Sequence, residues 1–378
     1  MRACAALAIV LTHTAFQTGQ VDGSVMGRIW GRFDMAVALF FALSGFLLWR
    51  SHARAAWTDA PRPNARRYYR SRLVRIMPAY LLVVVVALAL LPRSNPPAAS
   101  TWFANLTLTQ MFVPFSLTEG LTQMWSLSVE MAFYLLLPLV AVMMVRLRGP
   151  RARWRIPMVL LASVVSLGWA WIGAELALPQ GVNHHNWLPA YVPWFAAGIV
   201  LAEVVFAPPD RYRPLRRLAT RRICWPAAAV VFAIVATPIG GPVTLDTPAA
   251  WQFATRIALG GVLALLLLAP LVLAPAGTPA GRLGSGPMLA LGRWSYGIFI
   301  WHLVVLSALF PLFGILPFNG HMVQVTLLTV IFAAAVSALS YAWVEDPARR
   351  ALARFEARRS AAGTVDQAIS STPVSARP

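Results

Sequence analysis

Long apolar segments separated by short polar ones make up most of the chain. A helix that crosses a bilayer needs about 20 mostly apolar residues, and fewer where its ends are buried in protein. By this rule the pattern predicts about ten transmembrane helices, with the ranges 3–17, 34–49, 76–92, 124–145, 156–174, 189–207, 223–238, 252–274, 294–313 and 322–344. The amphipathic stretch 101–116, interrupted by Pro114, is expected to be interfacial or re-entrant. The sequence therefore predicts an all-α, polytopic membrane protein.

The arginines divide the predicted loops into two classes. All 32 Lys+Arg residues are arginine, and with the N-terminus inside, 28 of them fall on one face and four on the other. Positive residues accumulate on the cytoplasmic side of membrane proteins. The distribution therefore predicts ten spans with both termini cytoplasmic. A chain rich in arginine and alanine and without lysine is typical of a GC-rich bacterial genome, so the expected location is the bacterial inner membrane.

The composition excludes a soluble protein. Hydrophobic residues make up 58% of the chain and charged residues 12%, with a mean hydropathy of +0.65, whereas soluble proteins carry about 25% charged residues. The net charge of +19 is explained by loop arginines that meet anionic lipid headgroups, and not by nucleic-acid binding. Cys4 and Cys224 lack metal-ligand spacing, so no metal site is predicted. The polar segment 348–378 is expected to be a disordered cytoplasmic tail.

An ionisable residue inside a predicted span is a candidate functional residue, because placing it in a membrane is costly. His13 follows Arg2 by eleven residues in the first span. On an α-helix this spacing puts both side chains on one face, about 16 Å apart along the axis. Arg2 is therefore expected at the cytoplasmic mouth and His13 near mid-membrane. A buried neutral histidine bonded to a neighbouring helix is the alternative for His13.

A second cluster lies between Trp125 and Tyr134. Glu130 and Tyr134 are four residues apart and share a helix face. A carboxylate at this depth must be protonated, paired with a base or in contact with water. A structural tie between Glu130 and an arginine or histidine of another helix is the alternative to a catalytic role, and the two roles are compatible.

The third cluster is the arginine-rich segment 66–80, which leads into the third span. Arg72 and Arg75 are three residues apart and face one way if the helix starts early. Guanidinium groups bind phosphate through paired hydrogen bonds. The cluster therefore indicates a phosphate-binding site, with a lipid-headgroup anchor as the alternative.

Three shorter motifs complete the pattern. Ser44 and Gly45 form a small pair in mid-span, where helices can approach closely. Segment 291–302 opens the ninth span, contains Ser295 and Tyr296, and buries a second histidine, His302. Segment 345–347 is expected to end the tenth span, because its proline stops a helix.

Together these motifs resemble the acyltransferase 3 family of integral membrane acyltransferases, whose members O-acylate sugars of bacterial surface glycans, lipids and some small molecules. The resemblance covers nearly the whole chain. It is carried by Arg2–x10–His13, FF-x-LSGF at Phe40–Phe46, R-x-x-R-I-x-P-x-Y at Arg72–Tyr80, W-S-L-x-V-E at Trp125–Glu130, L-G-x-x-S-Y…H at Leu291–His302, and Glu345-x-Pro347.

The chain also departs from the family pattern. Ala38 stands where the family often has an acidic residue, and Asp34 lies a turn earlier. Met131 replaces a second glutamate that often follows the position of Glu130. The C-terminal esterase-like domain of some members is not seen. The resemblance thus implies an acyltransferase 3 transmembrane domain over residues 1–347 that works without such a domain.

The resemblance implies acyl-CoA, most simply acetyl-CoA, as a cytoplasmic co-substrate and no permanently bound cofactor. Its phosphates would be bound by Arg2, Arg72 and Arg75. His13 would act as general base or acyl carrier, and Glu130 would orient a histidine. The remaining candidates are Tyr134, Ser295 and Tyr296 as oxyanion donors, His302 as a second acid/base or structural residue, and Ser44 and Trp125.

The implied acceptor is a hydroxyl group of a glycan, a glycolipid or a related molecule, and membrane lipids are the other expected partners. A transporter or flippase for a lipid or sugar conjugate would also place ionisable residues in the membrane. The inverted repeats common in transporters are not seen in this sequence, so the enzyme is the favoured hypothesis.

Overall fold

The structure is a computed structural model that describes residues 1–370 apart from 59, 92–95, 220–222, 276 and 280. Regular structure within these residues is entirely helical, which confirms the predicted fold class. The α-helices are α1 (Arg2–Gln17), α2 (Val25–Arg32), α3 (Ala36–Trp57), α4 (Ala65–Leu90), α5 (Ala99–Leu106), α6 (Trp125–Met143), α7 (Arg155–Leu167), α8 (Trp169–Ile172), α9 (Leu188–Phe206), α10 (Arg213–Ala219), α11 (Cys224–Val235), α12 (Ala250–Val272), α13 (Gly286–Phe313), α14 (Met322–Ser340) and α15 (Asp346–Ser370).

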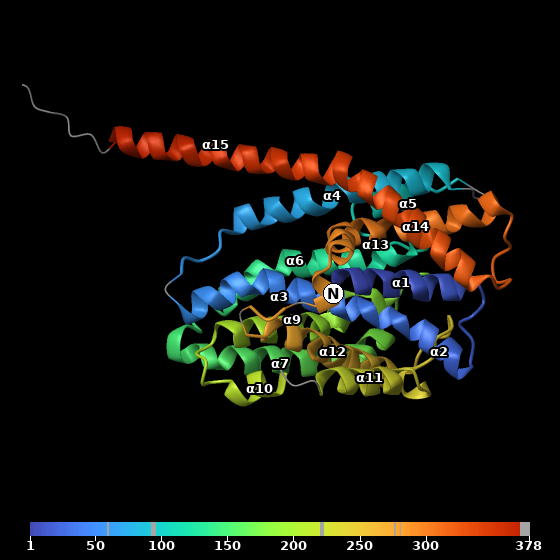
Figure 1. The fold of residues 1–378 in the computed structure, drawn as a ribbon, viewed down its shortest axis with the longest axis horizontal. Coiled ribbons are helices and arrows are strands. Elements are labelled where there is room, and N and C mark those ends of the chain that lie inside the picture. The colour runs from blue at the N-terminus through green and yellow to red at the C-terminus, as the bar shows by residue number, and fades with distance from the viewer. Residues whose placement is uncertain (59, 92–95, 220–222, 276, 280, 371–378) are drawn as a thin grey trace, which may run out of the picture.

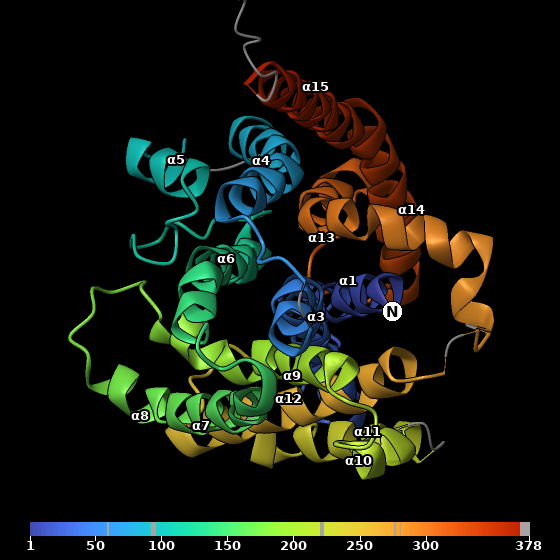
Figure 2. The ribbon, with the colours of Figure 1, turned by 90° about the vertical axis from the view of Figure 1, so that its left-hand side faces the viewer.

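The long helices lie side by side along one axis (Figure 1), and the end-on view places α1 and α3 in the middle of the bundle (Figure 2). Helix α3 packs directly on α9 through two glycines. A Cβ atom on Gly45 would lie 2.2 Å from the Phe195 carbonyl oxygen, and one on Gly198 would lie 1.8 Å from that of Ala42. The close helix approach predicted at the Ser44–Gly45 pair is therefore confirmed.

The number of spans is lower than predicted. Eight described helices are long and apolar enough to cross a membrane, or nine if the bent pair α10 and α11 forms one span. The predicted first span is α1, which has 16 residues, and the predicted seventh is α11, which has 12. A 16-residue helix is only about 24 Å long. In Figure 1 the N-terminus accordingly lies partway along the bundle and not at one of its ends.

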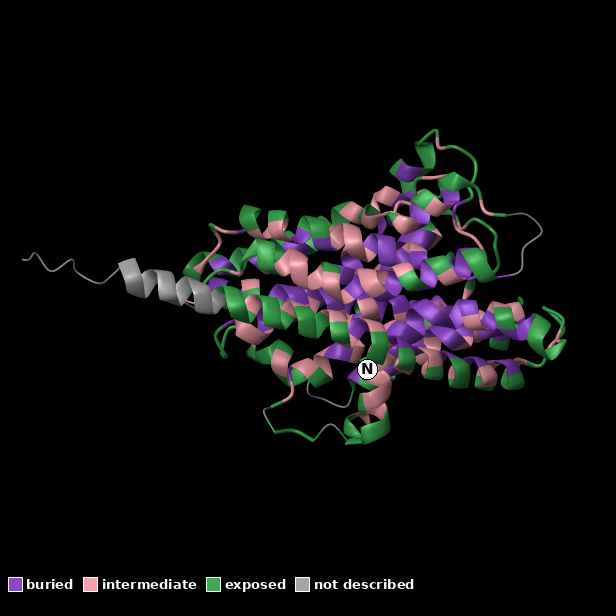
Figure 3. Ribbon diagram, turned by 90° about the horizontal axis from the view of Figure 1, so that it is seen from above, coloured by how far each residue is buried: buried purple, intermediate pink, exposed green. Residues whose placement is uncertain are grey.

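The outer surface of the bundle is apolar. Buried residues concentrate along the middle of the bundle, and exposed residues lie on the outward faces (Figure 3). Large hydrophobic side chains are exposed on α6 and α7, among them Leu135, Leu139, Leu161 and Val165. Such a surface is stable where lipid surrounds it. It supports a multi-pass membrane protein, while the orientation of the termini stays a prediction.

Helix α5 overlaps the start of segment 101–116, which was expected to be interfacial or re-entrant. It has eight residues and is followed by turns, so it is too short to cross a bilayer. The helix ends at Leu106, well before Pro114. Inside this segment the buried Asn105 side chain donates to the carbonyl oxygens of Thr101 and Ser116 at 2.9 and 2.8 Å.

The C-terminal segment differs from the prediction. Pro347 does not stop the helix, although it lies inside the continuous helical run from α14 into α15; the π-helical turn directly before it changes the hydrogen-bond pattern at the position where proline lacks an N–H. A π-helical turn, Tyr341–Glu345, joins α14 to α15. The predicted disordered tail 348–378 is helical as far as Ser370, and 371–378 lie outside the described residues. Glu356 accepts hydrogen bonds from Arg67 and Arg70 of α4, at 2.9 and 3.1 Å, and so ties α15 to the bundle.

Candidate functional site

Nine of the eleven predicted site residues line two neighbouring cavities, and the other two, Arg72 and His302, line neither. We call the first the arginine cavity. It measures about 60 Å³ and is lined by Arg2, Val37, Phe40, Phe41, Ser44, Arg75, Ile76, Ser126, Leu127, Glu130, Tyr134, Ser295, Tyr296 and Phe299. The second, the histidine cavity, measures about 390 Å³, and its lining includes His13, Asp34, Gln123, Trp125, Tyr191 and Arg256. The sequence predicted fewer than half of these lining residues, and it did not predict their division into two spaces.

Three cations gather at the arginine cavity. Arg2 comes from the start of α1 and Arg75 from α4, and both line the cavity. Arg72 lies close enough to both for their charges to repel one another. Among the described residues, none of the three forms a salt bridge. The predicted grouping of these arginines is therefore found, but Arg2 lies inside the bundle and not at its mouth.

Glu130 has different partners from those expected. Its carboxylate accepts a hydrogen bond from the Ser44 hydroxyl and another, of 2.5 Å, from the Tyr134 hydroxyl. The expected contact between Glu130 and a histidine is not formed. The reason is the position of Glu130 along α6. Trp125, at the start of this helix, lines the cavity that contains His13, whereas Glu130 lines the arginine cavity. Five residues of helix separate them, or about 7.5 Å along the axis.

The predicted oxyanion donors already have acceptors for their hydroxyl protons. Tyr134 donates to Glu130, as described above. The Tyr296 hydroxyl donates to the Ile76 carbonyl at 2.9 Å, and the Ser295 hydroxyl donates to the Gly292 carbonyl at 2.9 Å. These groups can donate to a substrate only after exchanging their present bonds.

The two membrane histidines lie next to each other. The ring centroids of His13 and His302 are 5.2 Å apart. Nδ1 of His302 lies 2.7 Å from the Phe299 carbonyl oxygen, so this nitrogen carries the proton and donates it, while Nε2 is buried without a hydrogen-bond partner. His13 has no hydrogen bond within the described residues and lines the histidine cavity. The alternative of a structural, bonded histidine thus describes His302 better than His13.

Three charged residues of the histidine cavity, Asp34, Asp246 and Arg256, were not predicted as site residues. Asp34 has a buried carboxylate oxygen without a hydrogen-bond partner. The charge of Arg256, on α12, acts on Asp34 across the cavity that both residues line. Both lie in apolar spans, and an ionisable residue in a span indicates function. The sequence shows both ionisable residues within spans, but Arg256 was interpreted only as one of the four arginines on the predicted non-cytoplasmic side.

A third buried charge, also missed, has a structural role. Glu203 of α9 accepts hydrogen bonds from Arg155 Nε at 2.6 Å, from Trp49 Nε1 at 2.6 Å and from Trp57 Nε1 at 3.0 Å. A buried ion pair is tolerated when its remaining hydrogen-bonding capacity is used in this way. The cluster joins α3, α7 and α9, and it lies outside both cavities.

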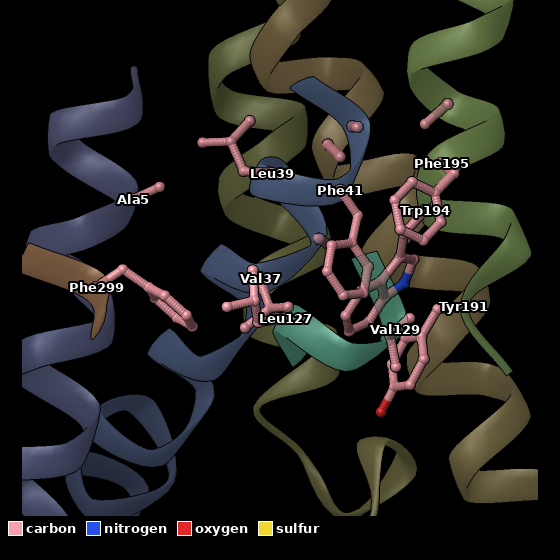
Figure 4. Close-up of a cluster of buried hydrophobic side chains, with 14 of the residues drawn as sticks. Ala5, Val37, Leu39, Phe41, Leu127, Val129, Tyr191, Trp194, Phe195 and Phe299 are labelled. Carbon is pink, nitrogen blue, oxygen red and sulfur yellow. The ribbon is translucent and has the colours of Figure 1, made fainter. Parts of the chain in front are cut away.

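One layer of side chains separates the cavities. Val37 of α3, Ser126 of α6 and Phe299 of α13 line both spaces. Figure 4 shows Phe299 and Val37 pointing toward each other from their two helices. The Phe299 ring also packs on Phe40, with 5.8 Å between centroids. A group that passes from one cavity to the other must cross this layer.

Within the described part of the chain, no group of three or more His, Cys, Asp or Glu residues is placed to hold a metal ion. The arginine cavity contains an arginine cluster and a hydrogen-bonded carboxylate, and the histidine cavity contains, among other polar groups, an imidazole without a hydrogen bond in the described part of the chain. This arrangement can bind an anion on one side of the layer and remove a proton from a hydroxyl group on the other.

A family model described as an acyltransferase domain matches residues 1–344. The chain is similar to Acyltransferase MdmB of Streptomyces mycarofaciens, with 27% identity over 99% of this chain and 95% of that protein. It is also similar to O-acetyltransferase OatA of Staphylococcus aureus (23% identity, 93% of this chain) and to peptidoglycan O-acetyltransferase OatA of Listeria monocytogenes (24%, 93%). The chain spans 56% and 55% of these two OatA proteins. No solved structure matches the chain.

Proposed function

The chain belongs to the acyltransferase 3 family of membrane acyltransferases, and we propose that it moves an acyl group from cytoplasmic acyl-CoA to a hydroxyl group of a glycan or glycolipid. The observation that carries this proposal is the adjacency of the two cavities, one with unpaired arginines and one with a free histidine. The printed name of the Listeria relative, a peptidoglycan O-acetyltransferase, supports an acetyl group and a carbohydrate acceptor.

The positive charges at the arginine cavity suit the phosphates of the donor. Coenzyme A carries a 3′-phosphate and a pyrophosphate, and guanidinium groups bind such oxygens through paired hydrogen bonds. Arg2, Arg72 and Arg75 repel one another while no anion is bound. An anionic ligand removes this repulsion, so its binding is favoured. The pantetheine arm separates the phosphates of CoA from its sulfur, which allows the thioester to extend toward the dividing layer while the phosphates stay with the arginines.

His13 supplies the base for the transfer. Its imidazole takes the proton of the acceptor hydroxyl as the oxygen attacks the thioester carbonyl carbon. The new C–O bond forms, the C–S bond breaks, and the leaving thiolate takes the proton back from the imidazolium. The products are an ester and free CoA thiol. His302 lies beside His13 with its own Nδ1–H bound to Phe299, so it positions the reacting ring.

The test is a transfer assay with the purified protein in lipid vesicles and acetyl-CoA labelled in the acetyl group. We expect equal amounts of CoA thiol and labelled acceptor. His13→Ala should lower the rate by about 10²- to 10⁴-fold, the usual contribution of a general base. The matched control is His321→Asn, because His321 is exposed and has a φ of 62°, a conformation that asparagine adopts readily.

The same vesicles distinguish an acyltransferase from a transporter. Release of CoA thiol that depends on both acceptor and His13 supports the acyltransferase. Movement of a glycolipid across the vesicle membrane without any release of CoA thiol would contradict it and would favour the flippase hypothesis.

A further inference from the structure

We propose that a third cavity, separate from the arginine cavity, binds the 3′-phosphate of the acyl-CoA donor. This inference rests on the proposed function and adds to it a second anion site and the residues that form it. It is carried by the basic lining of the third cavity, the fixed position of its buried arginine and its distance from the arginine cavity.

The third cavity lies between the end of α3, the start of α4, the end of α6 and the start of α7. It measures about 140 Å³, and its lining includes His52, Arg62, Tyr68, Val142, Arg148 and Arg155. The arginine distribution predicts that the α3–α4 and α6–α7 connections are cytoplasmic, and both lie at the same end of the bundle (Figure 1). This is the side from which the proposed donor arrives.

The lining of the third cavity is basic. It includes three arginines, Arg62, Arg148 and Arg155, and no acidic residue within the described part of the chain. Arg62 and Arg148 form no salt bridge with any described residue. Guanidinium groups bind phosphate through paired hydrogen bonds. The unpaired positive charge therefore indicates a phosphate group as the ligand.

Arg155 is fixed in position before a ligand binds. Its Nε donates to Glu203 at 2.6 Å, and its guanidinium carbon lies 5.1 Å from the centre of the Trp49 ring. Its Nη2 is buried without a hydrogen-bond partner among the described residues, so the guanidinium keeps a donor for a ligand. An arginine that is already held in this way loses little entropy when it binds an anion. Glu203 thus also positions Arg155 at the third cavity.

The sizes of the two basic cavities favour a divided donor site. The arginine cavity measures about 60 Å³ and the third cavity about 140 Å³, whereas sites that enclose a whole small molecule measure about 300–1,000 Å³. Neither cavity alone can enclose the nucleotide end of coenzyme A, which carries both the pyrophosphate and the 3′-phosphate. Each is therefore expected to hold one phosphate-bearing part of it.

The spacing of the two basic cavities matches the donor. On α4, Tyr68 lines the third cavity and Arg75 lines the arginine cavity, and the seven residues from one to the other span about 10.5 Å of helix. Arg72 lies between them along α4, and its charge acts on Tyr68. In coenzyme A the pyrophosphate and the 3′-phosphate are attached to the 5′ and 3′ oxygens of one ribose. The pyrophosphate can therefore reach Arg72 and Arg75 while the 3′-phosphate lies in the third cavity.

The first experiment compares acetyl-CoA with acetyl-3′-dephospho-CoA as donors in the vesicle assay. For the wild type, kcat/KM should be about 10- to 100-fold higher for acetyl-CoA, because the second donor lacks the group that accepts the charged hydrogen bonds. Arg148→Ala should lower this preference by about tenfold. Arg146→Ala, an exposed arginine of the same loop outside the cavity lining, is the matched control and should keep the preference. Equal use of both donors by the wild type would overturn the inference.

The second experiment measures occupancy without turnover. In a Cys4→Ala, Cys224→Ala background, Ala65→Cys places a thiol at the third cavity for reaction with a maleimide. In phosphatidylcholine vesicles, adenosine 3′,5′-bisphosphate should slow the labelling at an about tenfold lower concentration than 5′-AMP. Ser51→Cys, at an exposed position of α3 outside the lining, is the control and should be labelled at the same rate with and without nucleotide.

A phospholipid headgroup offers the same phosphate chemistry, and lipid has access because Val142 of the lining is 66% exposed on α6. The labelling is therefore repeated in vesicles that contain phosphatidylglycerol. If phosphatidylglycerol protects the thiol at Ala65→Cys and the bisphosphate does not, the cavity binds a lipid headgroup and the inference is wrong.

The two proposals fail in different ways. Absence of acetyl-CoA turnover with every acceptor would overturn the proposed function, and the labelling experiment would still test the nucleotide site. Turnover of acetyl-CoA without any preference over the dephospho donor would overturn the 3′-phosphate site alone.

Discussion

The two cavities share three wall residues but differ in every property that decides which ligand they accept. The arginine cavity is small, has three neighbouring cations, and contains the bonded group Ser44, Glu130 and Tyr134. The histidine cavity is larger, contains charges of both signs, and leaves polar atoms without partners. Under the proposed function, the difference indicates that recognition of the charged donor and proton transfer occur in separate spaces. We expect one side of the layer to bind an anion and the other side to activate a hydroxyl group.

The largest effect that would test this division is expected from Arg75→Ala or Arg72→Ala. Loss of a charged hydrogen bond, about 1.5–3 kcal/mol, should raise the KM for acetyl-CoA by about 10- to 100-fold. The acceptor KM should stay unchanged, because these arginines do not line the histidine cavity. Arg151→Ala, an exposed arginine of another loop, is the control. If the KM for acetyl-CoA is unchanged in these variants, the arginine cluster serves only as a lipid anchor.

A smaller effect is expected from His302→Ala. The variant removes the neighbour of the His13 ring, and slight misplacement of a reacting group lowers kcat by about tenfold or more. His302→Asn keeps a donor for the Phe299 carbonyl and should recover part of kcat. Steady-state kinetics with both variants check this. If alanine and asparagine are equally active, His302 does not position His13.

Phe299→Ala tests the layer that divides the cavities. Opening this layer admits water from the histidine cavity to the thioester, and exclusion of water is what prevents such side reactions. Hydrolysis of acetyl-CoA without acceptor should therefore rise by on the order of a few-fold. Phe299→Leu keeps an apolar side chain at this position and is the control. Equal hydrolysis by wild type and Phe299→Ala would show that Phe299 is not the barrier.

The smallest effect is expected from Tyr134→Phe, which removes one hydrogen bond to Glu130. A bond to a charged group contributes about 1.5–3 kcal/mol, so the midpoint of thermal unfolding should fall by a few degrees. The kcat and the acceptor KM should change little. Tyr341→Phe, whose hydroxyl has no hydrogen bond within the described residues, is the control. An unchanged midpoint for Tyr134→Phe would mean that the carboxylate finds another donor.

Residue spacing predicted the site contacts that lie within one helix. The shared face of Glu130 and Tyr134 follows from their four-residue separation, and the structure confirms their contact. The contact between Ser44 and Glu130 joins positions 86 residues apart. The pair His13 and His302 depends likewise on how α1 and α13 pack. Helix rotation and packing are decided by the whole bundle, so the sequence identified these residues but not their partners.

The lengths of the transmembrane helices were also not predicted correctly from the sequence. Hydropathy identified α1 and α11 as apolar segments, but it does not show how far a helix reaches along the bundle. The end of the last span was misplaced for a local reason. Proline removes one hydrogen bond from the interior of a helix, and the π-helical turn directly before Pro347 lets the helix continue past it.

The glycine contact between α3 and α9 has a consequence for how the enzyme can move. Because no atom larger than hydrogen fits at Gly45 or Gly198, neither helix can slide past the other without a clash. Val37 is carried by α3 and therefore belongs to an immobile platform, whereas Phe299 is carried by α13 on the other side of the layer. Under the proposed function, we therefore expect the passage for the acyl group to open by a swing of the phenyl ring or a shift of α13, while α3 and α9 stay fixed.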